Sequence, residues 1–101
     1  MTTDAPIVAR PKYPLSEDDL AGDLIQRDNP LFGAVWVNPA RMHGTPCFAG
    51  TRVPVRTLFD YLEAGDDLGT FLDDFEGVAR EQAVAVLEMS RSRLLDEWVG
   101  R

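Results

Sequence analysis

The sequence predicts a mainly α fold in which three helices form the outline of a helix-turn-helix unit, preceded by a short N-terminal β element and an extended N-terminal arm. Two patterns support this prediction. Apolar residues recur at helical spacing in two short segments and one long segment after Pro54, and a run of β-branched and aromatic residues at 31–37 is typical of a strand. The chain has 101 residues, of which 45% are hydrophobic, so it suits one small domain.

Residues 1–30 are predicted to form an arm that contains one short helix. Three prolines among the first 14 residues favour an extended chain there. Ser16 is followed three residues later by an acid, which resembles a capping box, and Leu20 and Leu24 then form a narrow apolar stripe. We therefore expect a marginal helix over 16–28 that needs a surface to pack against.

Residues 31–101 are predicted to form the helix-turn-helix domain. The strand at 31–37 ends at Asn38-Pro39, and Pro54 can open the first helix. The helices are expected at 55–64, 68–75 and 79 to about 99, with Asp66 or Asp67 as the cap of the second. Their apolar faces are expected to hold Leu58, Phe59 and Leu62 in the first helix, Leu68, Phe71, Leu72 and Phe75 in the second, and Val84, Leu87, Leu94, Leu95 and Trp98 in the third.

The charge of the chain is acidic and unevenly distributed. The formal net charge of −7 argues against a strongly basic nucleic-acid coat protein and suits a basic protein partner. Residues 1–31 and 66–101 together carry −8, whereas residues 32–65 carry +1. Any contact with a phosphate backbone is therefore expected in the middle of the chain.

Two further features concern the cellular compartment. No apolar run is long enough to span a bilayer, and the N-terminal residues lack the apolar core of a secretory signal. The single cysteine, Cys47, excludes an internal disulfide framework and agrees with a reducing compartment. We therefore expect a cytoplasmic protein that does not associate with membranes.

The stretch at 43–55, HGTPCFAGTRVPV, has the appearance of a phosphate-binding loop or a reactive cysteine site. A nucleotide-binding loop needs four residues between its glycines and a lysine after the second, whereas five residues separate Gly44 from Gly50 and no lysine follows. Cys47 and His43 lack a third orienting group, and one His and one Cys fall short of a tetrahedral metal set. We therefore expect no enzyme activity, no metal and no cofactor.

This stretch is instead interpreted as a rigid connector between the strand and the first helix. Gly44 and Gly50 permit positive φ, and the two prolines fix φ. Such a turn would present Arg52 beside the core. Arginine suits both a phosphate contact and an ion pair with a carboxylate of the protein itself, so both roles of Arg52 remain open.

The residues of this region resemble a known family. The run Val35-Trp-Val-Asn-Pro, the loop from Gly44 to Val55 and a helix ending at Ala64-Gly65 are similar to the prokaryotic domain-of-unknown-function family four-three-three. The resemblance covers about residues 33–96 and is most specific in the loop, where six or more positions agree in order. Asn38 replaces the usual Asp, and the second helix opens with a different set of residues from the family pattern.

The resemblance implies a homeodomain-like helix-turn-helix fold with an N-terminal β element. Many members of the family look like antitoxins whose genes lie beside those of PIN-like ribonuclease toxins. Such antitoxins generally form homodimers, bind operator DNA and block the toxin. The chain is therefore expected to be an antitoxin-like protein of a type II toxin-antitoxin pair that represses its own operon.

Five residues are candidates for DNA binding if the third helix enters the major groove. Arg80 and Gln82 lie at the start of that helix and are expected to read bases or hold phosphate, and Arg41, Arg52 and Arg56 are expected to contact phosphate. The alternative for Arg80 is a solvated helix residue that pairs with a nearby carboxylate.

Three residues are candidates for contact with a partner protein. An acidic inhibitor suits the basic or metal-binding cleft of a ribonuclease, and the acidic arm or the acidic C-terminal helix could supply the contact through Leu20, Leu24 or Trp98. Trp98 could equally pack on a dimer mate. The alternative function is a protein-interaction module that uses a helix-turn-helix scaffold without binding DNA, which the net charge of −7 favours.

Overall fold

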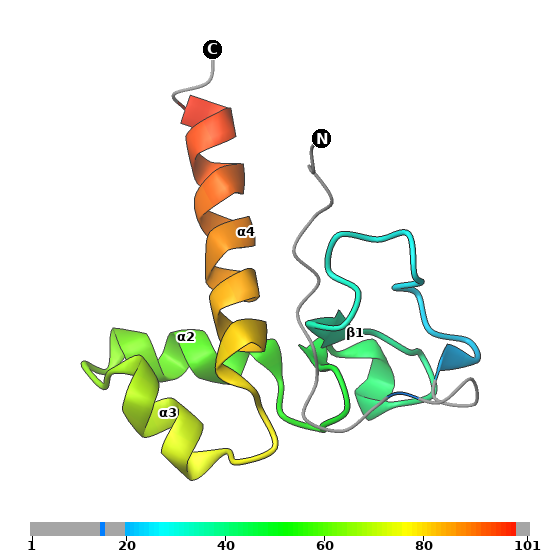
Figure 1. Ribbon diagram of the computed structural model, residues 1–101, viewed down its shortest axis with the longest axis horizontal. Coiled ribbons are helices and arrows are strands. Elements are labelled where there is room, and N and C mark those ends of the chain that lie inside the picture. The colour runs from blue at the N-terminus through cyan, green and yellow to red at the C-terminus, as the bar shows by residue number, and fades with distance from the viewer. Residues whose placement is uncertain (1–14, 16–19, 99–101) are drawn as a thin grey trace, which may run out of the picture.

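The computed structural model describes Leu15 and residues 20–98, with the side chains at 97 and 98 left out (Figure 1). The extended arm predicted for the first residues, including the proposed cap at Ser16, lies outside the described residues. The fold class is confirmed: the described chain is mainly α, with three helices and a small β element before them.

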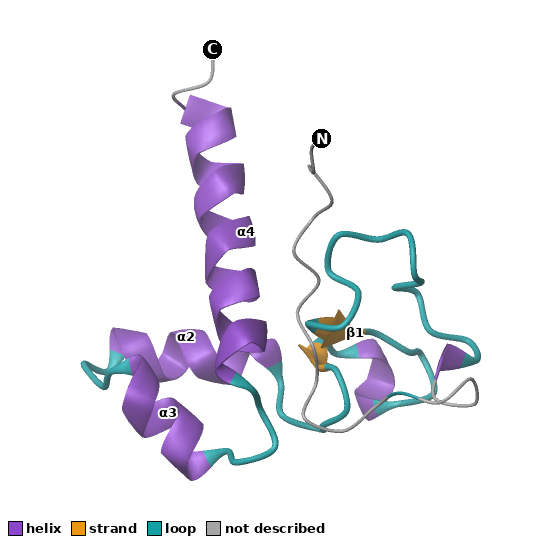
Figure 2. Cartoon of the chain, in the orientation of Figure 1, coloured by secondary structure: helices purple, strands orange, loops and turns teal. Residues whose placement is uncertain are grey.

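The predicted strand and three helices follow one another in the expected order, and η1 and β2 are additional elements between them (Figure 2). They are β1 (Val35–Trp36), the short 3-10 turn η1 (Met42–Gly44), β2 (Cys47–Phe48), α2 (Val55–Glu63), α3 (Leu68–Asp74) and α4 (Arg80–Trp98). In Figure 1, α2 and α3 lie side by side, α4 rises away from them, and the β element lies beside the base of α4. None of the helices in the described ranges is long and apolar enough to cross a membrane.

The β element is shorter than predicted and pairs within the chain. β1 and β2 are antiparallel, with Val35 opposite Phe48 and Trp36 opposite Cys47. Residues 31–34 form a turn instead of the first half of a strand, because Gly33 adopts a φ of 88° and the N–H groups of Ala34 and Val35 both donate to the Leu31 carbonyl. The β-branched and aromatic character of 31–37 therefore reflects burial more than strand length.

The helix that was expected over 16–28 does not continue beyond Leu20, and residues 21–28 form turns and bends. Gly22 adopts a φ of 78°, which is outside the helical region and which glycine reaches without strain. The Asp23 carboxylate accepts the Ile25 N–H over 3.0 Å, which is the local side-chain bond that competes with a helix. Ile25 is buried in the same core as the helices, so this segment packs on the domain.

The start of α3 decides between the two candidate caps. The Asp67 carboxylate accepts the Thr70 N–H over 2.8 Å, whereas Asp66 precedes the cap position. This bond to the backbone N–H of Thr70 holds the pKa of Asp67 below its usual range. The helix that begins here ends near Asp74, where the side-chain oxygen accepts a hydrogen bond of 2.6 Å from the Tyr61 hydroxyl.

The core is centred on Phe71 of α3 and joins the β element to all three helices. The Phe71 ring centroid lies 5.8 Å from that of Phe48, 5.5 Å from that of Tyr61 and 5.1 Å from that of Phe75. Leu58 of α2 is fully buried in the same cluster. Offset and edge-on ring packing of this kind stabilises a core beyond the area that it buries.

The apolar face predicted for the last helix is wrong in part. Ala83 and Val86 of α4 face the core, so the side chain at 84, which points the other way around the helix, is exposed. Leu94 and Leu95 belong to the second half of α4, a helix that rises away from α2 and α3 (Figure 1). The exposed fractions are 40% for Val84, 60% for Leu94 and 39% for Leu95.

Candidate functional site

Cys47 is part of the interior of the loop and not an exposed thiol. Its side chain is fully buried, and Sγ donates to the Thr45 carbonyl at 3.5 Å. Burial raises the pKa of the Cys47 thiol, and the nearby Arg41 charge offsets only part of this effect. His43 is exposed and adopts a φ of 56° in the η1 turn. A buried neutral thiol of this kind behaves as a small apolar side chain.

The second half of the loop is held by the Thr51 side chain and backbone. Thr51 Oγ1 donates to the Phe48 carbonyl over 2.8 Å and accepts the Val53 N–H over 3.0 Å. Trp36 Nε1 donates to the Thr51 carbonyl over 2.8 Å, which ties the loop to β1. Gly50 adopts a φ of 84°, as expected for this connector. The result is a rigid turn that carries Arg52 at its outer edge.

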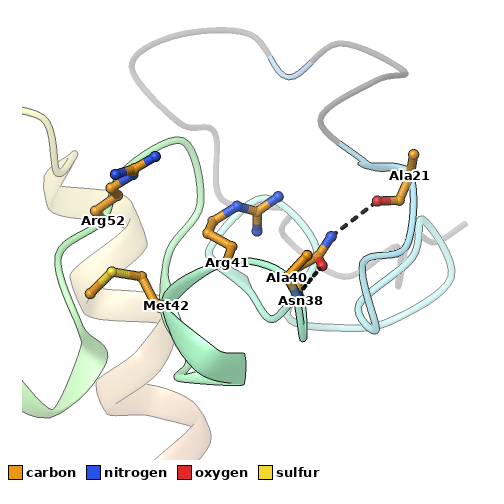
Figure 3. A pocket seen from close by; sticks show the side chains of 6 residues that line it. All are labelled: Ala21, Asn38, Ala40, Arg41, Met42 and Arg52. Atoms are coloured by element: carbon orange, nitrogen blue, oxygen red, sulfur yellow. Dashed lines mark hydrogen bonds between the residues drawn. The ribbon is translucent and has the colours of Figure 1, made fainter.

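Arg52 is exposed and is not paired with any carboxylate in the part of the chain that the structure describes. It borders an open polar pocket of about 400 Å³ together with Asn38, Arg41 and Met42 (Figure 3). The sequence left two roles open for Arg52, a phosphate contact and an ion pair with a carboxylate of the protein itself. The second role has no support among the residues that the structure describes.

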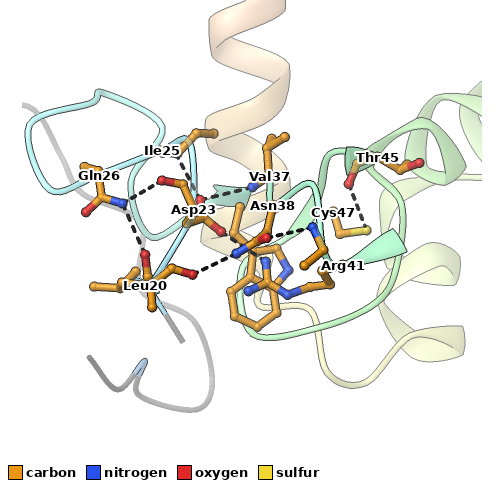
Figure 4. Close-up of polar contacts among 12 residues, drawn as sticks. Leu20, Asp23, Ile25, Gln26, Val37, Asn38, Arg41, Thr45 and Cys47 are labelled. Atoms are coloured by element: carbon orange, nitrogen blue, oxygen red, sulfur yellow. Dashed lines mark hydrogen bonds and ion pairs between the residues drawn. The ribbon is translucent and has the colours of Figure 1, made fainter. Parts of the chain in front are cut away.

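Arg41 makes internal contacts, which differs from the expected phosphate contact. Its guanidinium lies 3.0 Å from the Asp23 carboxylate, and its central carbon lies 3.6 Å above the Trp36 ring (Figure 4). Only 19% of the Arg41 side chain is exposed, and the Asp23 side chain is fully buried. Arg41 thus holds the segment before β1 against the β element.

Asp23 and Asn38 are structural residues that sequence analysis missed. Besides Arg41, Asp23 accepts the N–H groups of Ile25 and Val37. Asn38 donates from its side chain to the Ala21 carbonyl over 3.0 Å, and its side-chain oxygen accepts the N–H of the residue two positions later (Figure 4). The Asn38-Pro39 pair indicated a turn, but no pattern in the sequence marks Asp23 as a buried carboxylate.

Gln82 is fully buried, which argues against the predicted role of its side chain in reading bases. Its oxygen accepts the Ala79 N–H over 2.9 Å, and its nitrogen donates to the carbonyls of Gly33 and Ala49, each over 2.9 Å. Both ends of the amide are therefore occupied inside the protein. Gln82 is the third residue of α4, which is where the Glu or Gln of a capping box stands. This pattern could have indicated from the sequence that its side chain accepts the Ala79 N–H.

Arg56 and Arg80 are both exposed. Arg56 lies 3.8 Å from Asp60 one turn later on α2, a surface pair that contributes little to stability. Arg80 is the first residue of α4. These positions agree with the predicted solvent-facing sites, while their contact with DNA stays a prediction.

The loop that carries Arg52 borders the turn that precedes Arg80. A Cβ atom added at Gly77 would lie 3.4 Å from Thr51 Cγ2, so the two backbone segments are adjacent. This turn leads directly into α4. Arg52 and Arg80 are therefore carried by neighbouring segments of the surface.

The three partner-contact candidates differ in their surroundings. Leu20 is buried within the chain, which argues against a contact with a partner. Leu24 is 66% exposed and remains available. Trp98 is the last residue of α4, and its side chain lies outside the described residues. The exposed apolar residues of α4 extend the candidate surface beyond this set.

An open groove of about 470 Å³ runs beside α4. Its floor is apolar and includes Leu31, Val84 and Met89, whereas Glu81 and Glu88 lie along it. It lies on the outward side of the helix, away from the buried Val86. This groove and the exposed leucines farther along are apolar surfaces of α4 outside the core.

The three helices, the short β hairpin and the connector define a small helix-turn-helix protein of the mainly α class. A family model described as "Protein of unknown function (DUF433)" matches residues 35–88, slightly more than half of the chain. The chain belongs to the DUF433 family, which confirms the resemblance carried by the strand, the connector and the helix after it. The match includes both strands, α2, α3 and the first half of α4. No curated protein and no solved structure matches the chain.

Proposed function

We propose that this chain is an antitoxin-like protein that binds a PIN-like ribonuclease toxin through α4 and neutralises it in the cytoplasm. The observation that supports this proposal is the exposure of Val84, Leu94 and Leu95 on a helix whose first half is held by the core. Large apolar side chains exposed along one helix are typical of a protein-binding surface. The same helix is rigidly attached to the domain through Gln82, so its exposed face is presented in a defined direction.

The charge of the chain supports a protein partner as well. A net charge of −7 favours association with a basic surface through electrostatic steering. A ribonuclease cleft that binds an RNA backbone has such a surface. Two of the five DNA-binding candidates, Arg41 and Gln82, make internal contacts. Fewer side chains are therefore available to contact DNA, which favours protein binding over DNA binding as the main activity.

The test is purification of the tagged full-length chain from its native cell, followed by an RNA-cleavage assay of the protein that accompanies it. We expect a PIN-like nuclease in stoichiometric amount, inhibited by the chain. The double substitution Leu94→Gln/Leu95→Gln keeps helix propensity and should weaken inhibition by about tenfold, because it removes two exposed apolar anchors. Arg56→Gln/Glu63→Gln, at exposed positions of α2, leaves the net charge unchanged and is the matched control. A nuclease that stays fully active with the wild-type chain would refute the proposal.

A second activity, binding of operator DNA as a homodimer, is favoured by one observation. Arg52 and Arg80 are both exposed and are carried by neighbouring segments, and Arg80 is the first residue of the helix that would enter the major groove. Binding to the DNA upstream of the gene should weaken linearly with the logarithm of salt concentration. Arg52→Ala and Arg80→Ala should each reduce that slope by about one, whereas Arg93→Ala should not. No salt-dependent binding, alone or with the partner, would leave the protein-interaction module as the function.

A further inference from the structure

The groove beside α4 combines an apolar floor with acidic side chains. Leu31, Val84, Ala85 and Met89 line its floor. Val84 is 40% exposed, so a large apolar side chain that lines the groove lies in contact with solvent. A groove of this composition is suited to the apolar face of a second helix.

The two acids of the groove, Glu81 and Glu88, are seven residues apart on α4. Seven residues are close to two helical turns, so both side chains start from the same side of the helix, about 10 Å apart along its axis. Each acid already has a contact within the chain, and that of Glu88 is an ion pair with Arg91 at 3.7 Å between largely exposed side chains, which contributes little. A stronger basic partner could therefore replace Arg91 at small cost.

We infer that this groove binds an amphipathic helix of the partner protein, with an apolar face on the floor and two basic side chains seven residues apart opposite Glu81 and Glu88. The inference rests on the proposed protein-binding function and specifies the chemistry of its partner. Charge complementarity determines which helix can bind, because two acids along an apolar groove favour a basic helix and disfavour an acidic one.

A second copy of this chain does not meet these requirements. It would bring a further −7 and its own Glu81 and Glu88 to the groove. Among the described helices, the basic residues of α4 lie at 80, 91 and 93, and α2 has only Arg56, so none presents two bases seven residues apart. The complementary helix is therefore expected in a different protein.

The probe is a synthetic helical peptide with leucines at helical spacing and two lysines seven residues apart, titrated against the full-length chain by fluorescence anisotropy. We expect saturable binding that weakens with salt and falls by about tenfold in Glu81→Gln/Glu88→Gln, because two exposed ion pairs are lost. Glu63→Gln/Asp73→Asn changes the net charge equally at exposed positions outside the groove and should leave the affinity within about twofold. A peptide of the same composition with its lysines on opposite faces should bind about tenfold more weakly.

Equal affinities of the two double variants for the first peptide, or equal affinities of the two peptides for the wild-type chain, would overturn the inference. Self-association of the chain that Val84→Ser abolishes would also overturn it, because a second copy would then occupy the groove.

Circular dichroism of each variant verifies that α4 remains folded. If the nuclease partner binds Glu81→Gln/Glu88→Gln as tightly as the wild type, the groove assignment fails while the proposed function stands. If the wild-type chain inhibits no nuclease, the proposed function fails independently of the peptide result.

Discussion

The side-chain nitrogen of Gln82 donates a hydrogen bond of 2.9 Å to the carbonyl oxygen of Gly33, which lies 49 residues earlier in the chain. The same nitrogen donates to Ala49, and the side-chain oxygen accepts the Ala79 N–H. One buried amide thus joins the turn before β1, the residue after β2 and the start of α4. The orientation of α4 relative to the β element depends on this side chain.

Replacement of Gln82 by leucine, which has a similar volume, should lower the free energy of unfolding by about 3 kcal/mol. The substitution leaves the Gly33 and Ala49 carbonyls and the Ala79 N–H buried without their partner, and an unsatisfied buried polar group costs about 1–3 kcal/mol. Urea unfolding followed by circular dichroism measures the loss. Arg80→Ala, at an exposed position on the same turn, should change stability by less than about 0.5 kcal/mol. A similar effect of both substitutions would contradict the assigned role.

Arg41→Ala should destabilise the fold by about 3 kcal/mol, because it leaves the buried Asp23 carboxylate without its nearest base and removes the guanidinium from the Trp36 ring. Arg52→Ala, in the neighbouring loop, is the control and should have little effect. In a double-mutant cycle, Asp23→Asn combined with Arg41→Ala should cost less than the sum of the single changes. Additive losses would mean that the two side chains are not energetically coupled.

The Cys47 thiol should react with iodoacetamide at pH 8 at least about a hundredfold more slowly in the native protein than in urea, since it is buried and its pKa is raised. A raised pKa in the folded state means that the contribution of the neutral thiol to stability is complete below about pH 8.5 and is lost as the pH rises through the folded value. Unfolding of the wild type and Cys47→Ala at pH 7 to 10 should show the difference decline at high pH. Rapid alkylation of the native protein would show that the loop opens readily.

Asp67→Ala should lower the melting temperature at pH 7 by less than Gln82→Leu, because it removes the cap of α3 from an exposed position. The pKa of Asp67 is lowered in the fold, so its contribution is complete above about pH 4 and is lost as the pH falls through the folded value. The difference from the wild type should therefore become smaller in strong acid. Asp67→Asn retains a capping side chain and should not show this pH dependence. A constant difference from pH 7 to pH 2 would exclude the charged cap.

Local signals in the sequence were sufficient for the three helices. Pro54 opens α2 and Asp67 caps α3, as the turn and capping patterns predicted. The predicted boundaries of these three helices lie within about one residue of the observed ones where the structure describes them. Such signals act through bonds between residues close in sequence, so the sequence alone contains them.

The candidate site was less accessible to prediction, because its residues were assigned by type and not by surroundings. Arg41 and Arg52 have the same side-chain chemistry, yet one lies against Asp23 and Trp36 and the other faces solvent. Gln82 occupies a position that would read bases if exposed, but it is buried by contacts with segments 33 and 49 residues away. Contacts over such separations leave no periodic pattern in the chain.

The sequence by itself determined the mainly α class, the order of the elements, the rigid Gly- and Pro-containing connector and the family, because these depend on local backbone preferences and short-range spacing. The tertiary structure decided which polar side chains are internal and which face of α4 is free. It ended the first predicted helix at Leu20 and turned Val84 to solvent. The physical reason is that burial depends on contacts between distant segments, whereas helix formation depends largely on neighbours in the chain.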